Sequence, residues 1–288
     1  MSLKEVKQRI QSVKNTQKIT SAMKMISAAK LRRAQNAIES VRPYKEKLYT
    51  MLLTYLSAAQ EVKTPYTRIG APRHVAIVAV SSDSSLCGSF NATIIRRANE
   101  VVDEYLHSGC ETVEVFPVGK KMAEALRKSG LPLDESLMQQ AGSPHYNDVS
   151  RVAYHLMERF AAGSLDRIEL VYTHFHSAAR HIPMRETFLP MDVTNIGSEA
   201  QSLNHDFIVE PDKERLIEAL LPRVTAMRLF TALLDSVAAE HAARMLAMQI
   251  ATDNADDLIT TLVREYNKSR QQAITNELLD IVSGSVNK

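Results

Sequence analysis

Residues 3–34 read LKEVKQRIQSVKNTQKITSAMKMISAAKLRRA, and the spacing of their apolar side chains decides the fold. Apolar residues recur at steps of three and four, and the same heptad register resumes further along the chain. No glycine precedes Gly70 and the one early proline is Pro43, so the pattern predicts a helix over residues 3–58. At 1.5 Å per residue this helix is roughly 80 Å long, with a kink expected at the proline. Its seam is formed by Leu3, Val6, Ile10, Val13, Leu31, Ala34, Ile38, Val41, Leu48, Leu52 and Tyr55.

The seam changes character in the middle of the quoted stretch. The extended register places polar side chains on it, and the neighbouring apolar side chains point elsewhere. Part of this segment is therefore expected to contact something besides its partner helix, and methionine suits an adaptable contact. The polar seam positions are Gln17, Thr20, Lys24 and Ser27, and the displaced apolar residues are Ile19, Met23 and Ile26.

A second long helix is predicted at the other end of the chain. From Pro211 to Ser283 there is no glycine and one further proline, Pro222, which predicts a helix roughly 100 Å long. Neither helix can bury its apolar stripe alone, so we expect the two to pair antiparallel as a left-handed coiled coil or to require a partner protein. The second stripe consists of Leu216, Leu220, Met227, Phe230, Leu234 and Val237, continued less regularly by Met245, Met248, Leu258, Leu262 and Tyr266.

The segment between the helices alternates strand and helix patterns. Such alternation predicts a Rossmann-like α/β domain with a mainly parallel sheet. The predicted strands are Arg73–Ser81, Val113–Val118 and Ile168–Phe175, with Ile182–Leu189 as an edge strand. Helices are expected at 90–106, 120–128 and 146–162. The predicted organisation is an N-terminal coiled-coil helix (1–60), a linker (61–72), the α/β domain (73–190), a linker (191–210) and a C-terminal coiled-coil helix (211–288).

Charge is distributed unevenly along the chain. The first 50 residues carry twelve Lys and Arg against three Asp and Glu, and the rest of the chain carries 23 against 30. A basic helix of this kind suits nucleic acid, anionic lipid or an acidic protein surface, or it is a solvated helix face. The two cysteines, Cys87 and Cys110, are expected to be free thiols, and no apolar run is long enough to span a bilayer.

Three groups of residues invite a catalytic or ligand-binding interpretation. The loop SSDSSLCGSFN, residues 81–91, follows a strand where a doubly wound enzyme binds phosphate, but it lacks both common glycine fingerprints. A turn that begins the next helix is the simpler interpretation. Cys87 would need a nearby base to act as a nucleophile. A metal at His174, His176 and His181 would need all three on one face, and surface histidines at strand ends are the better interpretation.

Four strings in the two terminal helices are similar to those of a known family. They are NTQKITSAMKMISAAKLRRA (15–34), RPY (42–44), EHAARMLAMQIATDN (240–254) and YNKSRQQAITNELLDIVSG (266–284). With them the chain resembles the gamma subunit of F-type ATP synthases. The resemblance covers both helices almost continuously and extends more loosely through the middle. It implies a non-catalytic central rotor without a cofactor or metal, which couples transmembrane proton flow to ATP synthesis or hydrolysis by rotating inside a ring of alpha and beta subunits.

The resemblance also implies which residues meet which partners. The basic helix would oppose acidic loops of the catalytic subunits. The expected contacts with the catalytic ring are Met23, Lys24, Lys30, Arg244, Gln271, Thr275 and Glu277. The expected foot, which meets the membrane c-ring and the epsilon subunit, is Arg42, Tyr44, Glu210 and Pro211. The implied location is the cytoplasmic face of a bacterial inner membrane, peripheral to it through the complex, with no nucleic-acid partner.

One departure from the family pattern concerns the loop after the first strand. The family usually shows Asp-Arg-Gly-Leu-Cys-Gly there, whereas this chain has Ser84 and Ser85 between Asp83 and Leu86. Any contact that the arginine makes is therefore in question for this chain. Two other classes of function stay open. A nucleic-acid-binding coiled coil predicts strongly salt-dependent RNA binding, and an enzyme built on the α/β domain predicts a ligand at residues 81–91.

Overall fold

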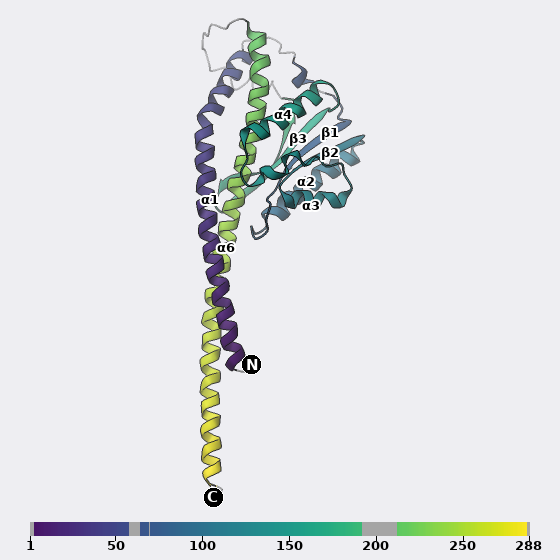
Figure 1. Ribbon diagram of the computed structural model, residues 1–288. Coiled ribbons are helices and arrows are strands. Elements are labelled where there is room, and N and C mark those ends of the chain that lie inside the picture. The colour runs from purple at the N-terminus through teal and green to yellow at the C-terminus, as the bar shows by residue number, and fades with distance from the viewer. Residues whose placement is uncertain (1–2, 58–63, 69, 192–211, 287–288) are drawn as a thin grey trace. The chain divides into compact units, whose positions relative to one another are not determined.

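The computed structural model describes residues 3–57, 64–68, 70–191 and 212–286 (Figure 1). It divides the chain into two compact units. The helical-pair unit contains the residues up to Ala28 and those from Arg244 onward, and the sheet unit runs from Ala29 to Ala243. Two long helices, α1 (Leu3–Ser57) and α6 (Lys213–Val286), each contribute a part to both units.

The two terminal helices predicted from heptad spacing are confirmed. In α1 the helix continues through Pro43, whose missing N–H removes the donor for the Glu39 carbonyl, and the predicted kink stays a prediction. In α6 the helix continues through Gly284 instead of ending before it. Glycine lowers helix propensity by about 1 kcal/mol without forbidding helical dihedrals, so one glycine does not terminate a helix of this length.

The sheet unit holds a four-stranded sheet in the order β2-β1-β3-β4. Strands β1 (His74–Val80), β2 (Thr112–Val118) and β3 (Arg167–Ser177) are parallel, and β4 (Arg180–Leu189) pairs antiparallel with β3 at the edge. All four strands confirm the predicted ones. The connecting elements are η1 (Pro65–Thr67), α2 (Phe90–His107), α3 (Lys120–Leu126), η2 (Arg127–Ser129), η3 (Glu135–Ala141) and α4 (Tyr146–Ala161).

Both faces of the sheet are covered, which explains why β1 is an unbroken run of apolar residues. Val75, Ile77 and Ala79 pack with α2 and α3. The alternate residues of β1 pack on the other face with α4, η3, α6 and the C-terminal part of α1, so the unit has a layered α/β core (Figure 1). Within this core, α6 is buried on nearly all sides from Val224 to Ala243. The domain boundaries proposed above stay a prediction, since several of them lie outside the described residues.

Candidate partner-binding surfaces

Hydrogen bonds between side chains of α1 and α6 join the two helices of the helical-pair unit. The Gln17 amide donates to Asp256 at 2.7 Å, the hydroxyls of Thr20 and Thr252 lie 2.8 Å apart, and the Lys24 ammonium donates to Gln249 at 2.8 Å. As the residue number rises on α1, its partner's number falls on α6, so the helices run antiparallel, as predicted. The polar seam expected from the heptad register is therefore confirmed.

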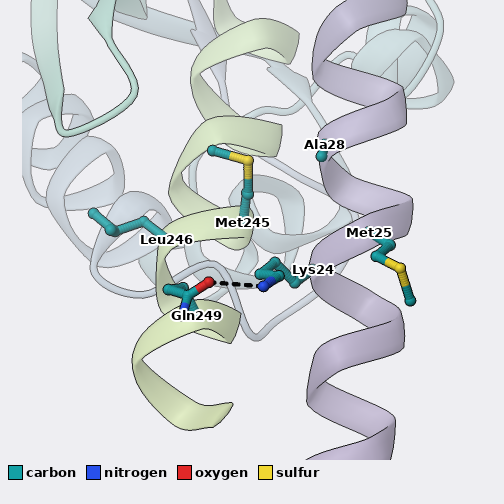
Figure 2. Close-up of a pocket in the computed structure, with 6 residues that line it drawn as sticks. All are labelled: Lys24, Met25, Ala28, Met245, Leu246 and Gln249. Atoms are coloured by element: carbon teal, nitrogen blue, oxygen red, sulfur yellow. Dashed lines mark hydrogen bonds between the residues drawn. The ribbon is translucent and has the colours of Figure 1, made fainter. Parts of the chain in front are cut away.

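The apolar side chains displaced from this seam lie at the surface. Ile19 and Ile26 are 60% and 57% exposed, and Met25 is 62% exposed. Met23 and Lys24 are half-buried. Figure 2 shows Lys24 reaching across from α1 towards Gln249 on α6. An open groove of about 330 Å³ lies here between the two helices, lined by Lys24, Met25, Ala28, Met245, Leu246 and Gln249.

The other residues expected to meet a catalytic ring differ widely in exposure. Lys30 is exposed, whereas Arg244 is only 8% exposed and presents little surface to a partner. Gln271, Thr275 and Glu277 are exposed, and the Thr275 hydroxyl donates to the Gln271 carbonyl within the helix at 2.9 Å. Their roles stay predictions.

The end of α6 is exposed on every side. All side chains from Gln271 to Val282 are exposed, and five of them are large and apolar. Each is between 49% and 65% exposed: Ile274, Leu278, Leu279, Ile281 and Val282. An exposed helical segment with this many large apolar side chains is typical of a surface that another protein covers.

The expected foot is described only in part. Arg42 and Tyr44 are exposed on α1, and Arg42 donates to Glu46 one turn later at 2.7 Å. This hydrogen bond raises the pKa of Arg42 above its ordinary value. Glu210 and Pro211 lie outside the described residues.

The crevice where a doubly wound domain binds its ligand is filled by the chain itself. Helix α2 follows β1 on one face of the sheet, whereas β3 is followed directly by the antiparallel strand β4. In the enzyme interpretation, a ligand would bind beyond the carboxyl ends of the parallel strands. Beyond these ends, Cys87 and Phe90 pack with Ala239 and Ala243 of α6, and Phe175 packs against them. Residues of α6 thus pack against the loop that the enzyme interpretation assigns to a ligand.

The loop at residues 81–91 satisfies its polar groups internally. Asn91 accepts from the Ser82 backbone N–H at 3.1 Å and from its hydroxyl at 2.9 Å, and donates to the Ser84 carbonyl at 3.1 Å. Cys87 is 1% exposed. Helix α2 begins at Phe90, as the simpler interpretation of this loop predicted.

The three histidines do not converge. His181 pairs with Phe175 across the β3–β4 ladder, so it lies on the opposite face from His174 and His176. His174 contacts Asp235 of α6, with 2.5 Å between the ring Nδ1 and the carboxylate, and burial lowers the pKa of His181. No group of three or more metal-binding side chains occurs among the described residues. Within the same part of the chain, none of the helices has the length and apolarity required to span a bilayer.

Comparison with known proteins decides between the classes of function. A family model described as ATP synthase matches residues 2–286. The chain is 49% identical to the ATP synthase gamma chain of Bacteroides thetaiotaomicron and 50% identical to that of Phocaeicola vulgatus, with 99% of both chains covered in each case. The chain belongs to the ATP synthase gamma-chain family.

Solved structures agree with this family at the level of the fold. The Euglena gracilis mitochondrial ATP synthase contains a chain with a TM-score of 0.64 at 20% identity, covering 99% of this chain and 93% of that one. The central stalk and c-ring structure from Tetrahymena thermophila gives 0.56 at 25% identity, covering 81% and 99%. As a member of this family, the chain is a gamma subunit of ATP synthase, a structural subunit of the rotor that is not catalytic by itself.

Two features of this gamma chain were not predicted from its sequence. The first is the groove that includes Met25 and Leu246, for which the available signal was apolar residues that leave the seam register. The second is the attachment of α6 to β3. Asp235 accepts from the Phe175 backbone N–H at 3.0 Å, and the Ser236 hydroxyl accepts from that of Thr173 at 3.2 Å. The two bonded pairs lie 60 and 63 residues apart in sequence, so no local pattern could reveal this attachment.

Proposed function

We propose that this gamma subunit is the central shaft that couples transmembrane proton flow to ATP synthesis or hydrolysis. In this proposal, the N-terminal part of α1, paired with α6, and the exposed end of α6 turn inside a ring of alternating alpha and beta subunits. The foot, with Arg42, Tyr44, Glu210 and Pro211, meets the membrane c-ring and the epsilon subunit at the cytoplasmic face of the inner membrane. The central stalk in the Tetrahymena structure is described together with its c-ring, which supports a foot of this kind.

The exposed end of α6 is the observation that carries the proposal. A single helix with five large apolar side chains in contact with water gains little stability from its own chain. A surrounding ring would cover this segment. The predicted contacts Gln271, Thr275 and Glu277 lie in the same segment and would supply polar partners within the apolar surface.

Two further properties suit a shaft. Seven Lys and Arg occur among the first 30 residues against one acidic residue, which would favour contact with acidic loops of the ring near Met23, Lys24 and Lys30. The shaft must also transmit force to the rest of the subunit. Within the sheet unit, α6 is held by hydrogen bonds from β3 to Asp235 and Ser236, so a turning force on this part of the helix would pass directly to the sheet.

The proposal explains coupling without chemistry in the shaft. The two helices present different side chains in different directions, so each surrounding catalytic subunit meets a different face. Rotation would then change which conformation each subunit favours, because a contact shifts an equilibrium only by its differential affinity for the two states.

Co-purification tests the assembly. A tagged full-length chain, expressed with the remaining subunits, should recover a stoichiometric ring that hydrolyses ATP. Recovery of a lone monomer would contradict the proposal.

A second measurement tests coupling: Met23→Lys adds a cation next to the partner's loops and should lower proton pumping per ATP hydrolysed while assembly is kept. Unchanged coupling would count against the role of Met23.

A matched pair of variants tests the exposed end of α6. Leu278→Glu with Ile281→Glu removes apolar contact and adds two negative charges, and Gln272→Glu with Asn276→Glu adds the same charge without removing apolar surface. We expect the first pair to lower proton pumping per ATP severalfold and the second pair to change it little. If both pairs lowered proton pumping per ATP equally, the added charge, and not the lost apolar contact, would be the cause.

A further inference from the structure

Between residues 19 and 27, α1 carries two stripes that are offset by one position. The polar stripe consists of Thr20, Lys24 and Ser27, and the apolar stripe consists of Ile19, Met23 and Ile26. Both have the spacing of four and then three residues that suits a helical seam. Since successive residues on an α-helix lie 100° apart, a rotation of α1 about its axis by one position would exchange the two stripes.

The observed burial is the reverse of what apolarity alone favours. Thr20 and Ser27 are 9% and 2% exposed, whereas Ile19 and Ile26 are 60% and 57% exposed. The hydrophobic effect by itself would bury the isoleucines and expose the polar side chains. At either end of this segment, Val6 and Leu31 share the seam register and are 2% and 8% exposed, so their burial opposes the rotation. Within the segment, a polar interaction must hold the polar stripe in place.

The hydrogen bonds across the helical pair are the polar interaction that acts within this segment. Gln17, Thr20 and Lys24 each bond to a side chain of α6, at 2.7–2.8 Å. A rotation of one position would carry these groups away from their partners. The buried Thr252 hydroxyl would then keep only its bond to the Met248 carbonyl, at 2.8 Å, and would face an apolar side chain. Single polar residues in the seam of a coiled coil are known to specify its register at a cost in stability.

We infer that Gln17, Thr20 and Lys24 are positioning residues, whose hydrogen bonds to α6 hold α1 in the rotation that keeps Ile19 and Ile26 at the surface. The apolar stripe is then available to the catalytic ring, a consequence that rests on the function proposed above. The hydrogen bonds of the polar seam would thus be the reason that the apolar stripe stays exposed. Lys24 acts in it through Gln249.

The rotation can be measured by thiol labelling of the full-length chain. In a Cys110→Ser background, with Cys87 only 1% exposed, one reporter is Ile26→Cys and the other is Ser27→Cys. With the native α6, the cysteine at position 26 should react with a maleimide at least tenfold faster than the one at position 27. A ratio near one in this background would overturn the inference at once.

The decisive variant removes the partners on α6. Gln249→Leu, Thr252→Val and Asp256→Leu leave an apolar surface that favours the isoleucine stripe. We expect the labelling ratio to fall at least tenfold, towards faster reaction at position 27, with helix content unchanged by circular dichroism. An unchanged ratio in a folded chain would show that the hydrogen bonds do not set the rotation.

A matched control makes the same three kinds of change at exposed positions of α6: Asp257→Leu, Thr261→Val and Gln272→Leu. This control should leave the labelling ratio as it is, and an equal fall would overturn the inference. If the partner variant fails to fold, the near-isosteric Thr252→Val alone replaces it. This single change should lower the ratio about threefold, and no change would again count against the inference.

Labelling in the assembled complex separates this inference from the proposed function. Contact with the ring should protect position 26 at least fivefold relative to the isolated chain. If the ratio in the isolated chain responds as expected but the complex gives no protection, the rotational lock holds and the contact of this stripe with the ring is wrong. If the isolated chain does not respond, the lock itself is wrong, whatever the complex shows.

Discussion

Two segments of the same helix, α6, differ in how far their side chains are buried. From Val224 to Ala243 the helix is buried on nearly all sides by the sheet unit, and from Gln271 to Val282 every side chain is exposed. Both segments are rich in large apolar residues, so composition does not distinguish them. The difference teaches that apolar residues in a long helix can serve two purposes: some stabilise the chain's own fold, and others, in the function proposed above, contact a partner.

The largest expected effect comes from truncating a buried leucine in the first segment. Leu233 is fully buried in the core, so Leu233→Ala should lower the free energy of unfolding by about 3 kcal/mol through lost burial and the cavity left behind. Chemical denaturation of the full-length chain measures it. A loss below about 1 kcal/mol would mean that α6 is not an integral part of this core.

A smaller effect is expected from the attachment of α6 to β3. Asp235 accepts from the Phe175 backbone N–H and contacts the His174 ring. Asp235→Ala should therefore cost about 2 kcal/mol, the range for hydrogen bonds to a charged group. Glu277→Ala, an exposed carboxylate on the same helix, is the control and should change the stability of the isolated chain by less than about 0.5 kcal/mol. If Asp235→Ala and Glu277→Ala lowered the free energy of unfolding equally, the buried segment of α6 would not be held more firmly than the exposed one.

The stability of the sheet unit should also depend on pH through the carboxyl group of Asp166. Burial raises the pKa of this carboxyl, but hydrogen bonds from the backbone N–H groups of His74 and Arg73 outweigh burial and lower the pKa below its ordinary value. The unfolded chain then binds this proton more readily. The stabilisation is complete above about pH 4 and is lost as pH falls through the folded-state pKa.

Asp166→Asn tests this dependence. It should cost about 1 kcal/mol at neutral pH and flatten the stability profile below about pH 4. Denaturation at a series of pH values, with wild type alongside, provides the measurement. A profile as steep as that of wild type would assign the acid sensitivity to other groups.

The smallest effect on stability is expected at the exposed end of α6. Leu279 is 61% exposed, so Leu279→Ala should change the unfolding free energy of the isolated chain by less than about 0.5 kcal/mol. Its proposed role is in the complex, where the same change should reduce recovery of the catalytic ring. The reduction should be similar at low and at high salt concentration, because an apolar contact is lost. Leu233→Ala and Leu279→Ala are the same substitution at a buried and at an exposed position of one helix, so their unfolding free energies can be compared directly.

Most of the secondary structure was predictable because it depends on local spacing. Heptad steps identified α1 and α6, and runs of β-branched and small residues identified the four strands. The short η3 helix, at Glu135–Ala141, was not predicted, because its one clear local signal is the cap that Asp134 forms with the Ser136 N–H. Such a cap is common in turns as well.

The candidate surfaces were predictable only in outline. The register identified Gln17, Thr20 and Lys24 as seam residues, but their partners on α6 depend on how two long helices align. The low exposure of Arg244 is likewise invisible locally, since its neighbours in the helix do not reveal what packs against them.

The sequence by itself determined that the chain has two long terminal helices around an α/β segment, and its terminal strings resembled one family. Only the tertiary structure decided which apolar residues are used inside the chain, where Lys24 points, and that α6 packs against the loop after β1. The reason is physical. Helix and strand periodicity arise from dihedral angles of consecutive residues, whereas burial and hydrogen-bond partners arise between residues such as Thr20 and Thr252, which are 232 positions apart.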